Sequence, residues 1–369
     1  MPRSKLRKAD AAWCALFIAM TCSCLLGDTR HAGGAGKAGV SELPAPASIV
    51  QYVRDRFEIP EKVKLDAEPL RRSSYPQFYQ TVVTLDDGKQ KQTSNVYITN
   101  DRLCFVMGNI FALTGASNEE ITRSLRDAAK VPPAAEVTVG TFKETPFLDF
   151  RKATVTVKDG SKVQTGGVFV TRDGRTGILG LVLPFRRDFV ERLINTQGQP
   201  SVGPAHARVT IVEYADLECP SCAYFHKFLE SEFLPKYGRK VRIIFKEFPL
   251  PSHEWSATAA VANECAYLMN PSKFLNYRTL IFGNQGTISA ANVRERLMSL
   301  GDQAGLKHAG LAACLDAQAS QERIEACKRE AENLGVNKTP TFCINGRIVV
   351  GVPSTAGFCK VVDEALAGK

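Results

Sequence analysis

Residues 209–226 read VTIVEYADLECPSCAYFH, and this stretch decides how the C-terminal half of the chain folds. A buried-strand pattern runs directly into Cys219 and Cys222, and an amphipathic helix follows. Pro220 suits the first turn of that helix, where its missing N–H costs nothing. The unpaired N–H groups and the dipole at a helix N-terminus favour a thiolate. The pattern therefore predicts a redox pair, with Cys219 as the exposed nucleophile and Cys222 as the more buried resolving thiol.

Zinc sites also use CxxC pairs, but a zinc ion needs four ligands. The chain has no second CxxC, and His226 supplies one further ligand at most. We therefore expect no metal and no other cofactor at this pair. His226 and His253 are expected to be ordinary histidines at the surface or the rim of the site.

Two further features are expected to lie near the cysteines. Glu213 precedes them on the predicted strand, where a partly buried carboxylate would exchange protons with Cys222. The alternative is an ordinary residue at the surface edge of that strand. Residues 339–341, Thr-Pro-Thr, open a late hairpin, where a cis proline would leave backbone groups free for a substrate strand.

The order of elements after residue 207 is β-α-β, a helical segment at about 252–334, and then β-β-α. The segments VEYADLECPSC, KEFPL and GVNKTPTFCINGR resemble the DsbA-like thiol–disulfide oxidoreductases. This resemblance implies that residues 207–369 form an α/β thioredoxin-like domain with a helical insertion. It implies that Cys219 is the nucleophile, that Cys222 is the resolving thiol and that Glu213 is the buried acid. Substrate contacts are implied for Pro220, Ser221, Thr339 and Pro340.

Eight of the eleven cysteines lie beyond the first 27 residues. The DsbA-like resemblance implies a structural disulfide between Cys265 and Cys314, the alternative being two buried free thiols. Cys327 has no evident partner. A Cys343–Cys359 pair is the less favoured alternative to two apolar fillers, and Cys104 is expected to be a small core residue.

The N-terminus has the layout of an export signal, because basic residues lead into the apolar run AAWCALFIAMTCSCLL. Residues 1–27 are therefore predicted to be an export signal, or a lipoprotein signal given Cys22 and Cys24, with an uncleaved anchor as the alternative. We expect a periplasmic or other extracytoplasmic location, where disulfides are permitted. Residues 28–48 are expected to be a linker.

The region between the signal and the cysteine pair repeats itself at an offset of 72 residues. Of the 36 ungapped pairs that begin with Phe78 and Phe150, 11 are identical. We therefore predict two repeated α+β units, 49–130 and 131–197, followed by a linker at 198–206. The segment VYITNDRLCFVMGNIFALTG resembles the cystatin-like N-terminal domain of DsbC and DsbG, which implies substrate binding and a homodimer. A duplicated unit could instead make that pairing within one chain.

Together these features predict an exported enzyme that exchanges disulfides with cysteine-containing protein substrates and is regenerated by a membrane redox partner. The net charge of +9 is spread along the chain, so no nucleic-acid surface is expected. Asp216 and Glu218 should disfavour a thiolate at Cys219, which favours a potential between roughly −270 mV for thioredoxin and roughly −120 mV for DsbA. The direction of electron flow stays open. The alternatives are a non-catalytic chaperone-like binding protein and a dedicated thiol reductase for one partner.

Overall fold

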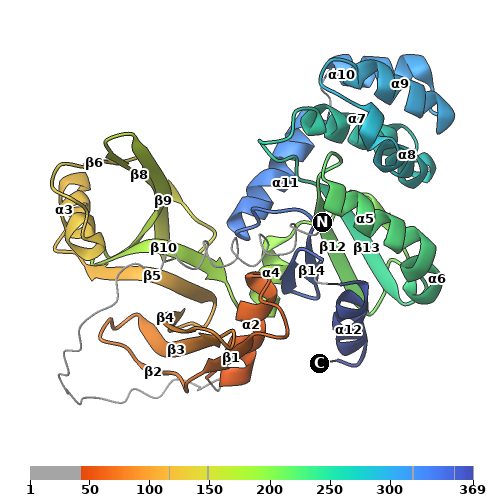
Figure 1. Ribbon diagram of the computed structural model, residues 1–369. Coiled ribbons are helices and arrows are strands. Elements are labelled where there is room, and N and C mark those ends of the chain that lie inside the picture. Colours follow the sequence, from red (N-terminus) through yellow and green to blue (C-terminus); the bar gives the residue numbers. More distant parts are fainter. Residues whose placement is uncertain (1–42, 116, 148, 318–319, 353, 369) are drawn as a thin grey trace. The chain divides into compact units, whose positions relative to one another are not determined.

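The computed structural model describes residues 43–369 except 116, 148, 318–319, 353 and 369. The predicted signal, 1–27, and most of the predicted linker lie outside the described residues. The chain divides into two compact units, with the boundary between Arg186 and Arg187 (Figure 1). Within the described residues, no helix has both the length and the apolar character needed to cross a membrane.

The N-terminal unit is an antiparallel sheet in which the described residues form ten strands, with one helix preceding each set of five. The first set comprises α2 (Pro46–Arg56), β1 (Lys64–Ala67), β2 (Arg71–Arg72), β3 (Phe78–Asp86), β4 (Lys91–Thr99) and β5 (Cys104–Ala112). The second set comprises α3 (Asn118–Ala129), β6 (Glu136–Val139), β7 (Lys143–Glu144), β8 (Phe150–Asp159), β9 (Lys162–Thr171) and β10 (Thr176–Pro184).

Strands pair in the same register in both halves of this sheet. Phe78 lies opposite Thr99 where β3 pairs with β4, and Phe150 lies opposite Thr171 where β8 pairs with β9, 72 residues further along. The halves join where β5 pairs with β10, and the sheet runs β1-β3-β4-β5-β10-β9-β8-β6. Phe78 and Phe150 stack on each other, with ring centroids 6.4 Å apart. The sheet therefore has an internal pseudo-twofold axis.

That axis passes between Gly108 and Gly180, which hold the same position in the two halves and lie opposite each other. Their φ angles are +140° and +153°. A Cβ on Gly108 would lie 2.3 Å from the carbonyl oxygen of Leu179, and a Cβ on Gly180 would lie 2.2 Å from that of Met107. The close approach of the two central strands thus requires glycine on both sides.

A repeated Thr-x-Asp tripeptide closes the turn that leads into each central strand. The Thr99 hydroxyl oxygen accepts the N–H of Cys104 at 3.0 Å, and the Asp101 carboxylate accepts the N–H of Leu103 at 2.9 Å. Residues 171–173 make the equivalent bonds in the second half. These identities between the halves therefore have a structural cause.

The boundary between the halves differs from the one expected at residue 130. Helix α3 joins an apolar cluster with the strands that follow it, in which Ile121 and Leu125 contact Val155 and Val168. Its Ser117 cap accepts the N–H of Glu120, so the helix begins a new segment. Each half therefore starts with its helix, because periodicity along a helix does not show which strands will cover it.

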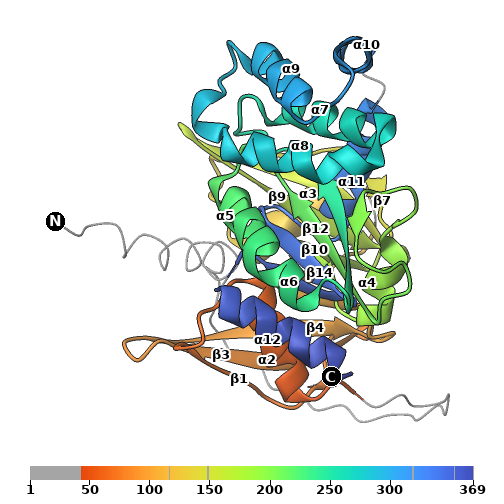
Figure 2. The same cartoon turned by 90° about the vertical axis from the view of Figure 1, so that its right-hand side faces the viewer.

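The C-terminal unit is built on a five-stranded sheet with the order β11-β13-β12-β14-β15, in which β12 and β13 are parallel. Helices α5 and α12 cover one face of the sheet (Figure 2), and their residues Phe225 and Phe358 lie in one apolar cluster. A second apolar cluster lies on the other face and contains Val190 of α4 and Leu334 at the end of α11. The elements are α4 (Arg187–Leu193), β11 (Ser201–Val202), β12 (Val209–Ala215), α5 (Pro220–Phe228), a π-helical turn (Leu229–Phe233), α6 (Leu234–Tyr237), β13 (Val241–Glu247), β14 (Thr341–Ile344), β15 (Arg347–Val350) and α12 (Thr355–Leu366).

Residues 187–197 belong to this unit, whereas the sequence places them in the second repeat. Val190 lies in the apolar cluster on the sheet. The N–H of Asn195 donates to Glu330 at 2.7 Å, and Lys246 Nζ donates to the carbonyl oxygen of Asn195 at 2.7 Å. These polar contacts hold the segment to the C-terminal unit, and they connect residues too distant in sequence to be predicted.

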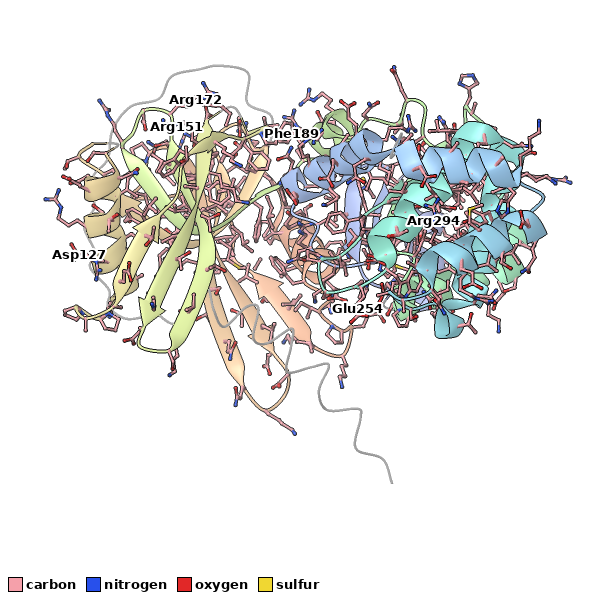
Figure 3. The ribbon with its side chains drawn as sticks, turned by 90° about the horizontal axis from the view of Figure 1, so that it is seen from above. Asp127, Arg151, Arg172, Phe189, Glu254 and Arg294 are labelled. Atoms are coloured by element: carbon pink, nitrogen blue, oxygen red, sulfur yellow. A yellow bond between two sulfur atoms is a disulfide. The ribbon has the colours of Figure 1, made fainter. Side chains whose placement is uncertain are left out.

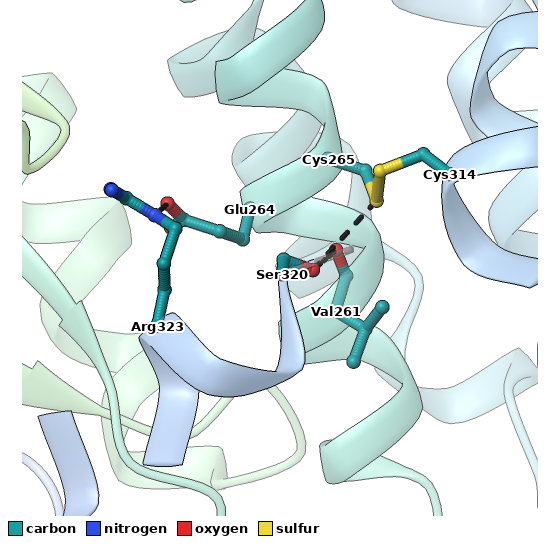
Figure 4. The surroundings of a disulfide bond; sticks show 6 residues. All are labelled: Val261, Glu264, Cys265, Cys314, Ser320 and Arg323. Carbon is teal, nitrogen blue, oxygen red and sulfur yellow. Dashed lines mark hydrogen bonds and ion pairs between the residues drawn. A yellow bond between two sulfur atoms is a disulfide. The ribbon is translucent and has the colours of Figure 1, made fainter. Parts of the chain in front are cut away.

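Helices fill the chain between β13 and β14, where the helical insertion is expected at about 252–334. They are α7 (Ser256–Met269), α8 (Pro271–Gly283), α9 (Val293–Gln303), α10 (His308–Ala317) and α11 (Gln321–Asn333), and we refer to this segment as the insert. Cys265 of α7 and Cys314 of α10 form a disulfide with an S–S distance of 1.99 Å (Figure 4). Nearby, the Ser320 hydroxyl donates to the carbonyl oxygen of Val261 at 3.1 Å.

Candidate active site

Cys219 caps the N-terminus of α5, and Pro220 occupies the first turn. The Cys219 side chain is 7% exposed, while Cys222, one turn further on, is fully buried. The Cys219 thiol lies 3.5 Å from the carbonyl oxygen of Thr339. Cys219 is therefore more accessible than Cys222, as expected, but it is buried rather than exposed.

This arrangement separates the pKa values of the two thiols. The pKa of Cys219 is lowered to about 5, chiefly by a hydrogen bond from the Cys222 thiol. The Thr339 side chain and the backbone N–H groups of Cys222 and Ser221 lower it further, against the opposing effect of burial. Burial raises the pKa of Cys222 well above its usual value, and its bond to Cys219 adds to this. Near neutral pH, Cys219 is a thiolate and Cys222 is a thiol.

The loop from Thr339 to Pro340 lies beside this pair, and its peptide bond is cis. β14 begins at the next residue and pairs with β12, so that Phe342 lies opposite Glu213. Pro220 and Ser221 are exposed at the start of α5, and Tyr224 in the same helix is 61% exposed. The structure thus gathers the predicted site residues at one end of the sheet, together with the exposed aromatic side chain of Tyr224.

Glu213 is fully buried rather than at a surface edge. Its Oε2 lies 3.5 Å from Arg278 Nη2, while its Oε1 has no hydrogen-bond partner among the described residues. Burial raises the pKa of Glu213, although the Arg278 guanidinium opposes the rise. The charge of Glu213 in turn contributes to the raised pKa of Cys222, so the two groups interact.

A second buried carboxylate, missed by the sequence analysis, shares the same arginine. Arg278 Nη1 lies 2.7 Å from Glu247 Oε1, which also accepts from Asn263 Nδ2 at 2.8 Å. Burial raises the pKa of Glu247 to about 7. Glu247 is the last residue of β13, and Glu213 lies two residues before the end of the neighbouring parallel strand β12. The register places Ala215 opposite Glu247, so the side chains of Glu213 and Glu247 share a face. The visible signal was an arginine at helical spacing from the apolar residues Phe274 and Ile281 of α8, since a buried arginine needs partners.

Two acidic residues beside Cys219 are hydrogen-bonded to other parts of the C-terminal unit. The Glu218 carboxylate accepts three N–H groups at the start of α7, from Glu254 (labelled in Figure 3) at 3.2 Å, Trp255 at 2.7 Å and Ser256 at 2.9 Å. The N-terminus of a helix favours negative charge, so this carboxylate is stabilised there. Glu218 is not among the main influences on the Cys219 pKa, so its expected effect on the thiolate stays a prediction.

Asp216 is held in a similar way. Its carboxylate accepts the N–H of Glu218 at 2.7 Å and the N–H of Leu250 at 2.7 Å, and it lies 2.8 Å from His253 Nδ1. Asp216 is likewise not among the main influences on the Cys219 pKa, and its expected effect on the thiolate stays a prediction. His253 itself is 22% exposed and lies at the rim of the site, as expected.

His226 lies in the core and not at the surface, which corrects the expectation. It is 2% exposed, and its Nε2 lies 2.9 Å from the hydroxyl of Thr279. Burial, and then the charge of Arg278, lowers the pKa of His226 to about 3, so its ring is neutral at physiological pH. Its spacing from Cys222 places it one turn deeper along α5, where the apolar face of the helix meets the insert.

The remaining cysteines among residues 43–369 are free thiols. Cys343 belongs to the apolar cluster on one face of the sheet, whereas Cys359 packs with the cluster on the opposite face, so the two do not pair. Cys104 and Cys327 are buried, and burial raises the pKa of each. In the described part of the chain, no three His, Cys, Asp or Glu side chains gather as metal ligands would.

Comparisons with known proteins match the C-terminal unit. Residues 195–364 match a thioredoxin family (Thioredoxin_4). Disulfide bond formation protein D of Bacillus subtilis is 25% identical over 187 residues, which cover 49% of this chain and 83% of that protein. The Na(+)/H(+) antiporter NhaA of Herminiimonas arsenicoxydans is 32% identical over 166 residues, or 45% of this chain; the match spans only 25% of the antiporter's length. The structure of oxidised BdbD from Bacillus subtilis has a TM-score of 0.44 and 22% identity, covering 47% of this chain and 95% of that one.

The C-terminal unit is therefore a thioredoxin-like domain with a helical insertion. Within that class, it is similar to a protein named for disulfide bond formation, and this supports a DsbA-like thiol–disulfide oxidoreductase.

Proposed function

We propose that this protein exchanges disulfides with cysteine-containing protein substrates through Cys219 and Cys222. The observation that carries the proposal is the placement of a low-pKa thiol, Cys219, at the N-terminus of α5 and above a buried second thiol. The resemblance to a protein named for disulfide bond formation supports it.

In the reducing direction, the Cys219 thiolate attacks a substrate disulfide, forms a mixed disulfide and expels one substrate thiolate. Cys222 then gives its proton to Glu213 and attacks the Cys219 sulfur, which releases the second substrate thiolate and leaves the Cys219–Cys222 disulfide. In the oxidising direction, the same steps run backwards, and Glu213 returns the proton to Cys222. The interaction between Glu213 and Cys222 supports this role.

Substrate would be held at the loop that faces the nucleophile. Thr339 and Pro340 lie beside Cys219, and Pro220 and Ser221 are exposed at the same end of the sheet. An extended substrate strand placed there would bring its cysteine to the Cys219 sulfur. Regeneration would fall to a membrane redox partner.

The redox potential is proposed to lie between the potentials of thioredoxin and DsbA. The Cys219 pKa of about 5 falls between roughly 7 for thioredoxin and roughly 3.5 for DsbA. Because a stabilised thiolate favours the reduced form, we expect a potential between roughly −270 and −120 mV. Equilibration with glutathione buffers measures it, and a value at either pole would contradict the proposal.

Two cysteine variants test the exchange itself. Cys219→Ser is expected to abolish disulfide exchange with a model protein substrate, while Cys327→Ser, which removes another buried thiol, is expected to retain it. Full activity in Cys219→Ser would favour the chaperone-like alternative. Cys222→Ser is expected to trap mixed disulfides, whose identification separates general substrates from a single dedicated partner.

The N-terminal unit is proposed to be a cystatin-like substrate-binding module of an extracytoplasmic protein. The disulfide between Cys265 and Cys314 supports export to an oxidising compartment. Strands β5 and β10 are each paired on both sides within one chain, so neither offers an edge to a second subunit. We therefore favour a monomer over the possible homodimer. Light scattering on the exported protein tests this, and a dimer would contradict it.

A further inference from the structure

Gln285 of the insert is hydrogen-bonded to residues 216–219, which we call the nucleophile loop. The proposed mechanism does not use this side chain. Gln285 follows α8 and begins a single turn of 3-10 helix, Gln285–Thr287. Its Nε2 donates to the carbonyl oxygen of Leu217 at 2.8 Å and to that of Cys219 at 3.2 Å. One amide thus holds two carbonyls of the loop.

Both carbonyls matter to where the nucleophile sits. Leu217 is 1% exposed, and a buried carbonyl without a donor is costly. The Cys219 carbonyl also accepts the N–H groups of Cys222 and Ala223, both at 3.1 Å, and these bonds form the first turn of α5. Gln285 therefore fixes the residue that carries the reactive sulfur and starts the helix.

Glu218, between the two held carbonyls, makes the reciprocal contact. Its carboxylate accepts three N–H groups at the start of α7, which also belongs to the insert. The loop is thus attached to the insert in both directions, by carbonyls that accept from Gln285 and by a carboxylate that accepts from α7. A change at Gln285 would loosen one of these attachments and leave the other in place.

We propose that Gln285 is a positioning residue for thiol–disulfide exchange: it holds the carbonyls of Leu217 and Cys219 so that the Cys219 sulfur stays over the N-terminus of α5. The proposal rests on the proposed function of Cys219. It assigns to the insert a direct part in setting the reactivity of the site, through an amide that touches neither sulfur nor substrate.

Two substitutions and one control test the assignment. Gln285→Ala removes the donor, and Gln285→Glu replaces it with a carboxylate that cannot donate when ionised. Gln303→Ala is the control, because Gln303 is an exposed glutamine of the same insert. For each variant, the Cys219 thiolate is titrated by its absorbance near 240 nm, and the glutathione equilibrium and the thermal midpoint are measured.

Gln285→Ala is expected to raise the Cys219 pKa by about one unit, the equivalent of losing one hydrogen bond's net contribution. The oxidised fraction at a given glutathione ratio should rise with it, by up to about tenfold in the equilibrium constant. Gln285→Glu should have the larger effect, and Gln303→Ala none. A titration unchanged in both Gln285 variants would overturn the proposal, even if they unfold more readily, because a purely structural residue would lower the midpoint alone.

The same data separate this proposal from the proposed function. If wild-type Cys219 titrates near its ordinary value of roughly 8.5, the proposed function loses its central support. If wild-type Cys219 titrates low and the Gln285 variants do not differ from it, only the positioning role fails.

Discussion

The N-terminal and C-terminal units use their sheets for different purposes. In the N-terminal unit, the repeated residues Phe78, Gly108 and Thr99 serve packing, strand approach and a turn. In the C-terminal unit, two carboxylates and Arg278 are buried together beside the cysteine pair. Buried charges cost stability, and perturbed titratable groups cluster at functional sites. The perturbed titratable groups near the cysteine pair thus lie in the C-terminal unit, whereas the repeated residues of the N-terminal unit stabilise its own sheet.

The largest effect should come from the acid beneath the thiols. Glu213→Gln keeps the shape of the side chain but removes the proton acceptor for Cys222. We expect the step in which Cys222 attacks the mixed disulfide to slow by about 100-fold, as is typical when a general base is lost. Stopped-flow measurement of substrate release checks this, with the exposed Glu295→Gln as control. An unchanged rate would remove Glu213 from the mechanism.

A substitution at the pseudo-twofold axis should affect only the N-terminal unit. Gly108→Ala places a Cβ 2.3 Å from the Leu179 carbonyl oxygen at an unfavourable φ. We expect a loss of about 3 kcal/mol in the stability of that unit, measured by denaturant unfolding with limited proteolysis. Gly166→Ala, whose Cβ would have ordinary contact with Val155, is the control. A matching loss in the C-terminal unit, or in the control, would undo the contrast between the units.

Glu247 should make the stability of the C-terminal unit depend on pH. Its folded pKa of about 7 lies above the unfolded value of roughly 4.3, so the folded state binds more protons between these values. In the oxidised protein, where the two active-site thiols do not titrate, stability should fall as pH rises from about 4.5 to about 7.

Glu247→Gln should remove a part of that fall, on the order of 2 kcal/mol. Urea unfolding at pH 4.5 and pH 8 measures it. Glu213, Glu264, Arg278 and Asn263 also face Glu247 and stay in place, so a smaller slope should persist. If the slopes of the wild type and the variant are equal, Glu247 does not hold a proton in the folded state.

The smallest effect is expected at Glu218. Because its carboxylate is bonded to the start of α7, Glu218→Gln should move the Cys219 pKa by less than about 0.3 unit, while weakening the cap of α7 modestly. Thiolate titration together with thermal unfolding distinguishes the two. A fall of a full unit in the Cys219 pKa would show that Glu218 repels the thiolate.

Local patterns predicted part of this molecule well. Cys219, Pro220 and Cys222 lie where one strand leads into one helix, as predicted. The 72-residue offset in the sequence corresponds to matching strand registers in the two halves of the N-terminal sheet. Contacts between segments that are distant in the sequence could not be predicted. Arg278 and Gln285 reach the site from the insert, and no local signal says which loop a helix of the insert will meet.

The same limit applies to Glu218. It is next to Cys219 in the sequence, and this nearness suggested repulsion of the thiolate. Its carboxylate accepts N–H groups that are unpaired at the start of a helix, and one of these donors lies 37 residues away in the sequence. His226 was assigned to the rim for a similar reason, since the helices that cover it come later in the chain.

Gly108 and Gly180 have a consequence for how this sheet is able to change over time. Of the 36 compared positions, 25 now differ between the halves (36 − 11), so most of the duplicate has drifted. At the axis, each glycine faces the backbone of the other half, and a side chain on either one would collide with it. A mutation there is felt at once by both halves. The axis is therefore the place where the two copies are obliged to stay alike.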